Sequence, residues 1–193
     1  MPKVTLRAVA AHDQERLLEW RNSDAVAPYM YSDHLISEGE HAAWFARLGT
    51  NPAVRYWIIE LDGHPVGLAN LADIDRHNSR CAWAYYLADP LVRGLGVGSF
   101  VEYWVIEYVF GELGLAKLWC EVIESNKAVW RLHEGFGFTR EAVLRNHVVK
   151  GGQALDVIGL GLLESEWRGA ARDAARERLI AKGFDLSDVP AAA

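Results

Sequence analysis

A glycine-rich segment, residues 93–99, stands between an apolar strand-like stretch and a long apolar helix-like stretch. It reads Arg93-Gly94-Leu95-Gly96-Val97-Gly98-Ser99. Glycine permits positive φ and close approach, so several backbone N–H groups can point into one concavity. The N-terminus of the following helix adds positive potential, which favours an anion such as a pyrophosphate. The spacing matches neither a dinucleotide-binding G-x-G-x-x-G loop nor a P-loop, and a plain strand–helix turn is the alternative.

Metal and thiol chemistry are not indicated by the histidines and cysteines. The seven histidines show no ligand spacing such as H-E-x-x-H, so we expect no metal site. Cys81 and Cys120 fall inside predicted strands, where a cysteine behaves as a small hydrophobic residue. No base is evident beside either thiol, so a thiol nucleophile is not expected.

The elements that must position the glycine segment follow from period-2 alternation and helical spacing. Ser37 and Glu40 form a capping box, which predicts a helix start. We expect strands at Val4–Ala8, Tyr56–Leu61, Val66–Ile74, Arg80–Leu87, Lys117–Ile123, Ala142–Lys150 and Ala154–Leu162. We expect helices at His12–Arg21, after Ser37, at Ser99–Phe110 and at Asn126–Glu134. This pattern is typical of one α/β domain over residues 1–163.

Residues 164–193 differ in composition and are predicted to form a helical extension with a loose end. The apolar face of the predicted helix is mostly alanine, whose burial stabilises little. We therefore expect the extension to be solvated or docked on a partner rather than to join the core.

Composition and charge exclude several function classes. The chain has 193 residues, of which 51% are hydrophobic and 24% charged, as in globular proteins. A net charge of −6 argues against a non-specific nucleic-acid binder. No stretch approaches the roughly 20 apolar residues of a membrane span, and the N-terminal residues lack the apolar core of a signal peptide. We expect a cytoplasmic protein that binds neither nucleic acid nor membrane.

The chain resembles the GNAT acetyltransferase superfamily in two motifs. The segment Arg93–Gly98 fits the acetyl-CoA loop (Arg/Gln)-x-x-Gly-x-(Gly/Ala), and Asn126 followed by Glu134-Gly135-Phe136-Gly137-Phe138 fits the second signature. The resemblance implies one mixed, mostly antiparallel sheet of about seven strands, flanked by helices and splayed between strands 4 and 5. Acetyl-CoA would enter that splay. The implied cofactor-binding residues are Leu87, Arg93, Gly94, Leu95, Gly96, Val97, Gly98, Ser99 and Asn126.

The resemblance also implies direct attack of an amine on the thioester, with a base to take the ammonium proton. Glu121, on the strand face of Trp119, is our candidate base, and an ion pair with a neighbouring strand is its alternative. His133 stands where many GNAT enzymes have a tyrosine that protonates the thiolate. A packed, hydrogen-bonded histidine is the alternative for His133.

Several short segments are similar to a nucleotide-sugar branch of the superfamily. They are Glu19-Trp20-Arg21-Asn22, Met30-Tyr31, His34, His41, Trp44-Phe45, Asp73-Ile74-Asp75-Arg76 and Leu144-Arg145-Asn146-His147. Members of that branch N-acetylate UDP-4-amino-4,6-dideoxy-N-acetyl-β-L-altrosamine on the way to pseudaminic acid, which decorates flagellin. The implied acceptor-binding residues are Arg21, Met30, Tyr31, Asp73, Asp75, Arg76, Trp83 and Arg145. Turn capping is the alternative for the aspartates, which are also the next candidate bases, and core packing is the alternative for Trp83.

Three alternative functions are also compatible with the sequence. Protein N-terminal acetyltransferases of the ribosomal-protein type share several of the local matches, and aminoglycoside acetylation is a further possibility. A closed acceptor pocket with aromatic and basic groups would favour a nucleotide sugar, and an open groove would favour a peptide. The non-enzyme rival is an acetyl-CoA-binding module without turnover. The expected assembly is a monomer or a homodimer.

Overall fold

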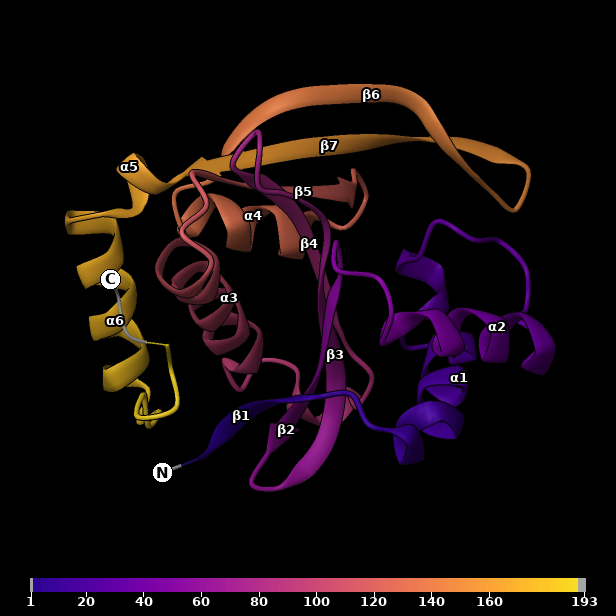
Figure 1. The fold of residues 1–193 in the computed structure, drawn as a ribbon. Helices are drawn as coiled ribbons and strands as arrows, with labels where there is room; N and C mark the ends of the chain where they lie inside the picture. Colours follow the sequence, from indigo (N-terminus) through magenta and orange to yellow (C-terminus); the bar gives the residue numbers. More distant parts are fainter. Residues whose placement is uncertain (1, 191–193) are drawn as a thin grey trace.

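Seven strands form a single sheet in a computed structural model that describes residues 2–190 (Figure 1). The order across the sheet is β1-β2-β3-β4-β5-β7-β6. The strands are β1 Val4–Ala8, β2 Arg55–Leu61, β3 His64–Asp75, β4 Arg80–Leu87, β5 Lys117–Ile123, β6 Thr139–Lys150 and β7 Gln153–Leu163. The predicted α/β class and strand number are confirmed.

The parallel pair β4–β5 is short, and it creates the predicted splay. All other neighbouring strands are antiparallel. The strands β4 and β5 pair only from Arg80 to Ala82 and from Lys117 to Trp119. Beyond these residues the two strands diverge, so the β5-facing edge of β4 has no ladder partner up to Leu87. The splay between strands 4 and 5 is confirmed.

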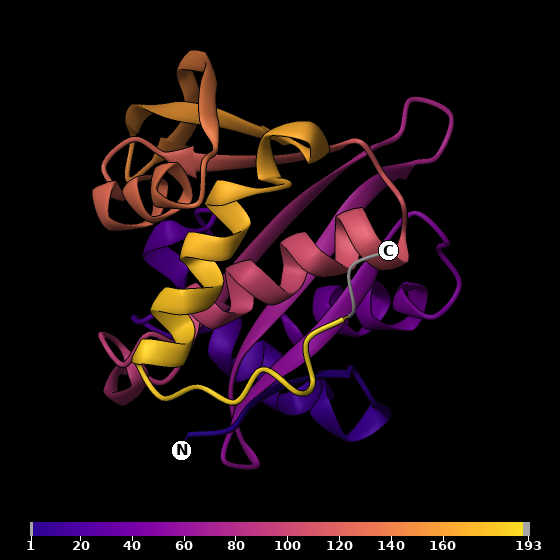
Figure 2. The same cartoon turned by 90° about the vertical axis from the view of Figure 1, so that its left-hand side faces the viewer.

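Helices cover both faces of the sheet. The helices α1 (Gln14–Asn22) and α2 (Glu38–Leu48) lie on one face, and α3 (Val97–Glu107), α4 (Lys127–Gly135) and α6 (Ala170–Ala181) lie on the other (Figures 1 and 2). The sheet serves both layers because neighbouring side chains of a strand point to opposite faces. In β2, Trp57 and Ile59 belong to the α3 core, whereas Ile58 packs with Leu17 of α1.

The C-terminal extension packs on the same core, so our expectation of a solvated or partner-docked segment is wrong. The residues that anchor it are buried: Trp167, Ala175, Leu179 and Phe184. The buried Glu107 carboxylate of α3 accepts hydrogen bonds from Trp167 Nε1 (2.8 Å) and from Arg172 (2.7 Å). The alanine face is narrow, but the flanking aromatic residues supply the apolar burial that alanine lacks. Figure 2 shows α6 lying beside α3.

Smaller differences concern element ends and one helix face. The strand β6 begins at Thr139, three residues before the predicted start, and β3 continues to Asp75. On α2, Ala43 is exposed and His41 is the buried residue. Within residues 2–190, no helix is long and apolar enough to cross a membrane.

Candidate active site

The glycine segment forms a turn that leaves backbone donors free. Gly94 (φ 81°) and Gly96 (φ 88°) adopt the left-handed conformation, and Gly96 is the N-cap of α3. Among the described residues, no carbonyl or side chain accepts from the amide N–H groups of Val97, Gly98 or Ser99. The first N–H groups of a helix have no intrahelical partner and bind anions well. This is the local geometry that the anion-binding prediction requires, and anion binding itself stays a prediction.

A cavity of about 460 Å³ lies against this turn and opens on the splay. We call this space the cofactor cavity. Eight of the nine predicted cofactor residues line it, from the end of β4, the glycine turn and the start of α4. They are Leu87, Arg93, Gly94, Gly96, Val97, Gly98, Ser99 and Asn126. Leu95 points outward and is 57% exposed. The Arg93 guanidinium donates to the Ala25 carbonyl (2.9 Å) and has no carboxylate within 4 Å among residues 2–190.

A second cavity of about 400 Å³ adjoins the first on the α1–α2 side. Met30, Tyr85 and Tyr86 line both cavities, so the two spaces meet at these side chains. The remaining walls of the second cavity are aromatic and basic; the polar and aromatic groups are Arg21, Glu40, His41, Trp44, Arg47, Tyr56 and Asn70. We call this second space the acceptor cavity.

The charged groups of the acceptor cavity are unevenly paired. Glu40 contacts His34 (3.1 Å). Within residues 2–190, neither Arg21 nor Arg47 has a carboxylate within 4 Å. Arg21 is partly buried and donates to Ser32 Oγ (2.5 Å), and burial lowers its pKa. Burial also lowers the pKa of His41, so its imidazole is neutral near pH 7. The cavity is therefore cationic.

A loop that crosses the splay is fastened to the tip of the β6–β7 hairpin. Lys150 Nζ donates to the carbonyls of Ala27 (3.2 Å), Met30 (2.7 Å) and Ser32 (3.0 Å). Gly151 N donates to the Asp33 carboxylate (2.8 Å). Because Met30 lines both cavities, Lys150 fixes part of the wall between them without lining either one.

Replacing Lys150 should therefore loosen the acceptor side of the site. We expect Lys150→Met to raise KM for the acceptor by about tenfold, equivalent to about 1.4 kcal/mol, and to leave the acetyl-CoA dissociation constant nearly unchanged. Steady-state kinetics and calorimetry separate the two. Arg145→Gln, on the same hairpin but exposed, is the matched control. An unchanged acceptor KM in Lys150→Met would show that the loop does not depend on this clamp.

Glu121 and His133, the two residues predicted to transfer protons, line neither cavity. The structure does not bring them together. Glu121 is exposed and shares its face with Trp119, as predicted from alternation. Tyr31 Oη donates to Glu121 Oε2 (2.7 Å) and Trp119 Nε1 to Oε1 (3.4 Å). Tyr31 itself lies beside His147 on β6. The carboxylate therefore stands at the outer side of the loop that Lys150 holds.

His133 is a buried partner of Glu102 on α3. Its Nδ1 lies 2.8 Å from Glu102 Oε1, and both side chains are almost inaccessible to water. Burial lowers the pKa of His133, but Glu102 and Cys120 more than offset it, and the pKa rises to about 10. Burial also raises the pKa of Glu102. The buried contact with Glu102 is the environment of the alternative that we gave for His133, a packed, hydrogen-bonded histidine.

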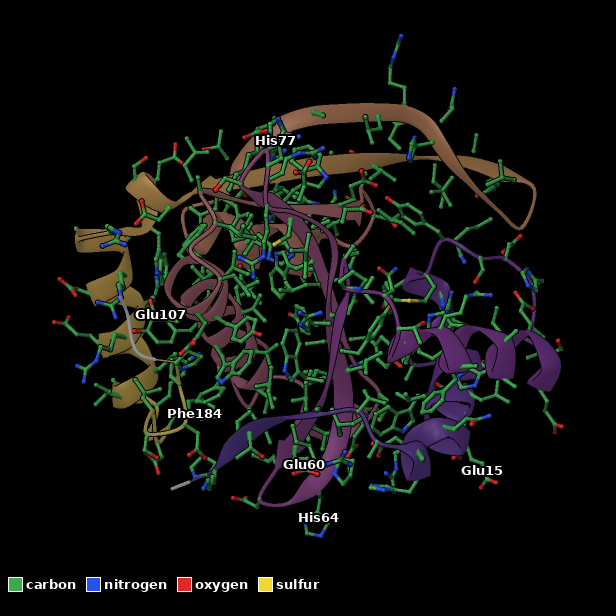
Figure 3. The ribbon with its side chains drawn as sticks, in the orientation of Figure 1. Glu15, Glu60, His64, His77, Glu107 and Phe184 are labelled. Carbon is green, nitrogen blue, oxygen red and sulfur yellow. The ribbon has the colours of Figure 1, made fainter. Side chains whose placement is uncertain are left out.

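Five predicted acceptor residues lie away from the acceptor cavity. Asp75 accepts from Asn78, Arg76 donates to the Leu113 carbonyl, and Asp73 (φ 50°) lies in a bulge of β3, so all three shape the β3–β4 hairpin. That hairpin is at the start of β4, and the strand extends about 23 Å, at about 3.3 Å per residue, to the end that leads to the glycine turn. In Figure 3, His77 of this hairpin lies near the top of the molecule, and Phe184, which lies near Gly96, lies in its lower left part.

The other two predicted acceptor residues outside the acceptor cavity are Trp83 and Arg145. Trp83 is 3% exposed and packs against Tyr85, His133 and Phe138, so it is a core residue. Arg145 is exposed in an irregular stretch of β6. Arg21 and Met30 alone among the predicted acceptor residues line the acceptor cavity, and Tyr31 adjoins it through Met30.

Sequence reasoning missed several cavity residues. His41 and Trp44 stand among the matched segments but were not predicted to bind the acceptor. Together with Arg47 they recur on α2 at spacings of three residues, which is one helical face. Lys182, which lines the cofactor cavity, comes from the extension and carried no local signal.

Comparison with known proteins identifies the fold and the reaction class. Residues 3–139 match the family model described as the acetyltransferase (GNAT) domain. The chain belongs to the GNAT acetyltransferase family. The protein is therefore an N-acetyltransferase that uses acetyl-CoA. Within the described residues, no group of three or more His, Cys, Asp or Glu side chains is arranged to hold a metal ion.

The acetyltransferase is similar in sequence to two bacterial N-acetyltransferases. It is 33% identical over 115 residues to the SPbeta prophage-derived uncharacterized N-acetyltransferase YokL of Bacillus subtilis, a match that spans 58% of this chain and 63% of that protein. It is 23% identical over 164 residues to the spermidine N(1)-acetyltransferase of Escherichia coli K12, spanning 85% of this chain and 88% of that one.

Solved structures share the fold. The acetyltransferase aligns with spermidine N-acetyltransferase from Vibrio cholerae in complex with CoA and spermine at a TM-score of 0.80 and 22% identity. The alignment covers 86% of this chain and 98% of that one. At this identity the likeness carries the fold and not the acceptor.

Proposed function

We propose that the acetyltransferase N-acetylates an amine whose molecule also carries an anionic group, with a UDP-linked 4-amino sugar as the specific candidate. The observation that supports this is the charge of the acceptor cavity. Arg21 and Arg47 line it with no carboxylate within 4 Å among the described residues, beside four aromatic side chains. Arginine is well suited to phosphate, and aromatic side chains are suited to stacking on a base. A diphosphate-linked sugar fits both properties.

A polyamine is the second candidate, because the spermidine acetyltransferases named above are similar to this chain. A polycation needs carboxylates, and Glu40 is the only acidic residue lining the acceptor cavity in the described part of the chain. Glu40 also acts electrostatically on Arg21, which lines the same cavity and competes with an amine for its negative charge. The acceptor cavity is thus a poorer match to spermidine than to an anion.

Acetyl-CoA fits the first cavity on three counts. The free amide N–H groups at the start of α3 suit its diphosphate. Arg93 and Lys182 add positive charge at the wall. The unpaired edge of β4 offers backbone N–H and C=O groups to the amides of the pantetheine arm. When bound, acetyl-CoA supplies the thioester that the acceptor amine attacks.

Direct transfer is the proposed route, in which the amine forms the new C–N bond as the C–S bond breaks. Both thiols of the chain are buried. Burial raises the pKa of Cys81 to about 12 and raises that of Cys120 as well. A thiol that stays protonated is a poor nucleophile, which supports the absence of an acyl-enzyme.

Glu121 remains the proposed proton acceptor, acting through water. Its support is an exposed carboxylate on the splayed part of β5, held by Tyr31 next to the wall residue Met30. We expect Glu121→Gln to lower kcat by about 10², the lower end of the general-base range, with unchanged acetyl-CoA affinity. Glu124→Gln, exposed just beyond the end of the same strand, is the control. A kcat within about threefold of wild type at every pH would remove Glu121 from the mechanism.

The acceptor is tested by mass spectrometry of products from acetyl-CoA and a panel of amines. The panel contains a UDP-linked 4-amino sugar, the same sugar without the nucleotide, spermidine, an aminoglycoside and a peptide with a free N-terminus. We expect kcat/KM to be highest for the UDP-linked sugar and to fall at least about tenfold without the nucleotide. Equal values for the two sugars, or preference for spermidine, would contradict the proposal. Absence of every product would favour a binding module.

A further inference from the structure

A third cavity, of about 210 Å³, lies between α3, α4 and the extension helix α6. Ser99, Leu132 and Lys182 line both this space and the cofactor cavity, so the two adjoin. The family model ends at residue 139, so the wall that α6 provides lies outside the matched domain. We call this space the extension cavity.

Three cations surround the extension cavity, namely Arg131 of α4, Arg178 of α6 and Lys182 just after α6. None of them has a carboxylate within 4 Å among residues 2–190. Other arginines behave differently; Arg140 and Arg172, for example, are paired with Glu134 and Glu107. In a chain with a net charge of −6, three unpaired cations around one space favour an anionic ligand.

Two of these cations are held in place by neutral contacts. The Arg178 guanidinium donates to the Gly135 carbonyl (2.9 Å) and lies over the Phe136 ring, 5.5 Å from its centroid. Arg131 lies over the Trp130 ring at 5.3 Å. Such contacts orient a guanidinium without neutralising it. The buried Glu102 carboxyl also acts on Arg178 electrostatically, but it makes no ion pair with Arg178 within 4 Å, so the remaining N–H groups stay available to an acceptor.

The extension also touches the glycine turn itself. A Cβ built on Gly96 would come within 3.0 Å of Phe184 Cε2 and 3.3 Å of Lys182 Cδ. The chain after α6 therefore packs directly against the N-terminus of α3, with the Lys182 stem beside the free amide groups. Figure 3 shows Phe184 below α6 on this side of the molecule.

We propose that the C-terminal extension completes the co-substrate site, with Arg131, Arg178 and Lys182 binding the 3′-phosphate of CoA. This rests on the proposed placement of the CoA diphosphate at the start of α3. From there, the adenosine end of CoA must leave the turn, and the extension cavity adjoins it through Ser99 and Lys182. Charged donors in a fork suit a phosphate, which accepts several charge-assisted hydrogen bonds.

The test compares CoA with 3′-dephospho-CoA, which differ only in this phosphate, by calorimetry on the full chain. We expect wild type to bind CoA at least about tenfold more tightly than dephospho-CoA. Lys182→Met should lower this ratio to about threefold, and Arg178→Gln/Lys182→Met should remove it. In both variants the affinity for dephospho-CoA should fall less than the affinity for CoA, because Lys182 also lines the cofactor cavity. Arg176→Gln, exposed on the same helix and equal in charge change, should keep the full ratio.

Two results would overturn the inference. One is a wild type that binds both ligands equally. The other is a Lys182→Met protein in which both affinities fall by the same factor, since that is a general effect of charge or folding. Lys182 is exposed and makes no side-chain hydrogen bond to the described residues, so this variant should fold. Failure of the underlying placement is separate, because Gly98→Val would then bind both ligands normally.

Discussion

A Gly98→Val acetyltransferase should fold and bind acetyl-CoA about 10³-fold more weakly than wild type. Gly98 is the second residue of α3, and a Cβ there would meet Tyr85 Oη at 2.8 Å. Tyr85 is held against Trp83 (ring centroids 5.5 Å apart), so its hydroxyl has little room to retreat. The branched side chain would fill the space before the free N–H groups. Losing two hydrogen bonds to a charged group costs about 3–6 kcal/mol.

The matched control for this substitution is Gly39→Val. Gly39 is likewise the second residue of a helix, α2, and nothing lies within 4 Å of its Cβ position. Gly39→Val should therefore keep the acetyl-CoA affinity of wild type. Gly96→Val is less informative, because a positive φ strains any side chain there and the extension is in contact. Calorimetry showing wild-type affinity in folded Gly98→Val would refute the placement of the diphosphate.

Removing the His133 imidazole should destabilise the protein by about 3–5 kcal/mol, because it leaves the buried Glu102 without a partner. Urea unfolding of His133→Phe measures this loss. His147→Phe, an exposed histidine, should stay within about 0.5 kcal/mol of wild type. The double variant Glu102→Leu/His133→Phe should regain most of the lost stability, since apolar groups can replace a buried ion pair.

The same pair sets an alkaline limit on stability. The pKa of His133 is raised in the folded state from 6.5 to about 10. Its contribution is therefore fully present below about pH 6.5 and is lost as pH rises through about 10. Wild type should lose stability across this range more steeply than the double variant. Equal stability of single and double variants would contradict the pair's role. A large loss of kcat in a fully stable His133→Phe would restore the acid role predicted from the sequence.

Short sequence motifs predicted most of the residues that line the proposed cofactor cavity. The glycine turn and Asn126 are short motifs, and a motif brings its own residues together. The splay between β4 and β5 was predicted from the family resemblance. Alternation of residue types within one strand does not show where its neighbouring strand diverges from it. The directions of Glu121 and His133 were the hardest to predict. Alternation placed Glu121 correctly beside Trp119, but the choice of which sheet face meets the cofactor depends on packing between distant elements.

The acceptor side was predicted less well for physical reasons. The Asp73–Arg76 match lies at the β3–β4 hairpin, away from the proposed acceptor cavity, and the direction of β4 that separates the two cannot be read from local sequence. Lys150 holds carbonyls more than a hundred residues away, which leaves no trace in local sequence. In the extension, the alanine face hid the anchoring aromatics Trp167 and Phe184, which lie outside the helix α6.

The short parallel pairing between β4 and β5 makes the stability of the sheet sensitive to a bound ligand. Three register pairs are all that join the β1–β4 half of the sheet to the β5–β7–β6 half through backbone ladders. A ligand lying in the splay would contact both halves and act as a reversible crosslink. By linkage, a ligand at 100 times its dissociation constant adds about 2.7 kcal/mol to folding stability. Saturating CoA should then slow hydrogen exchange most at the amides of β4 after Ala82, which lack ladder partners toward β5.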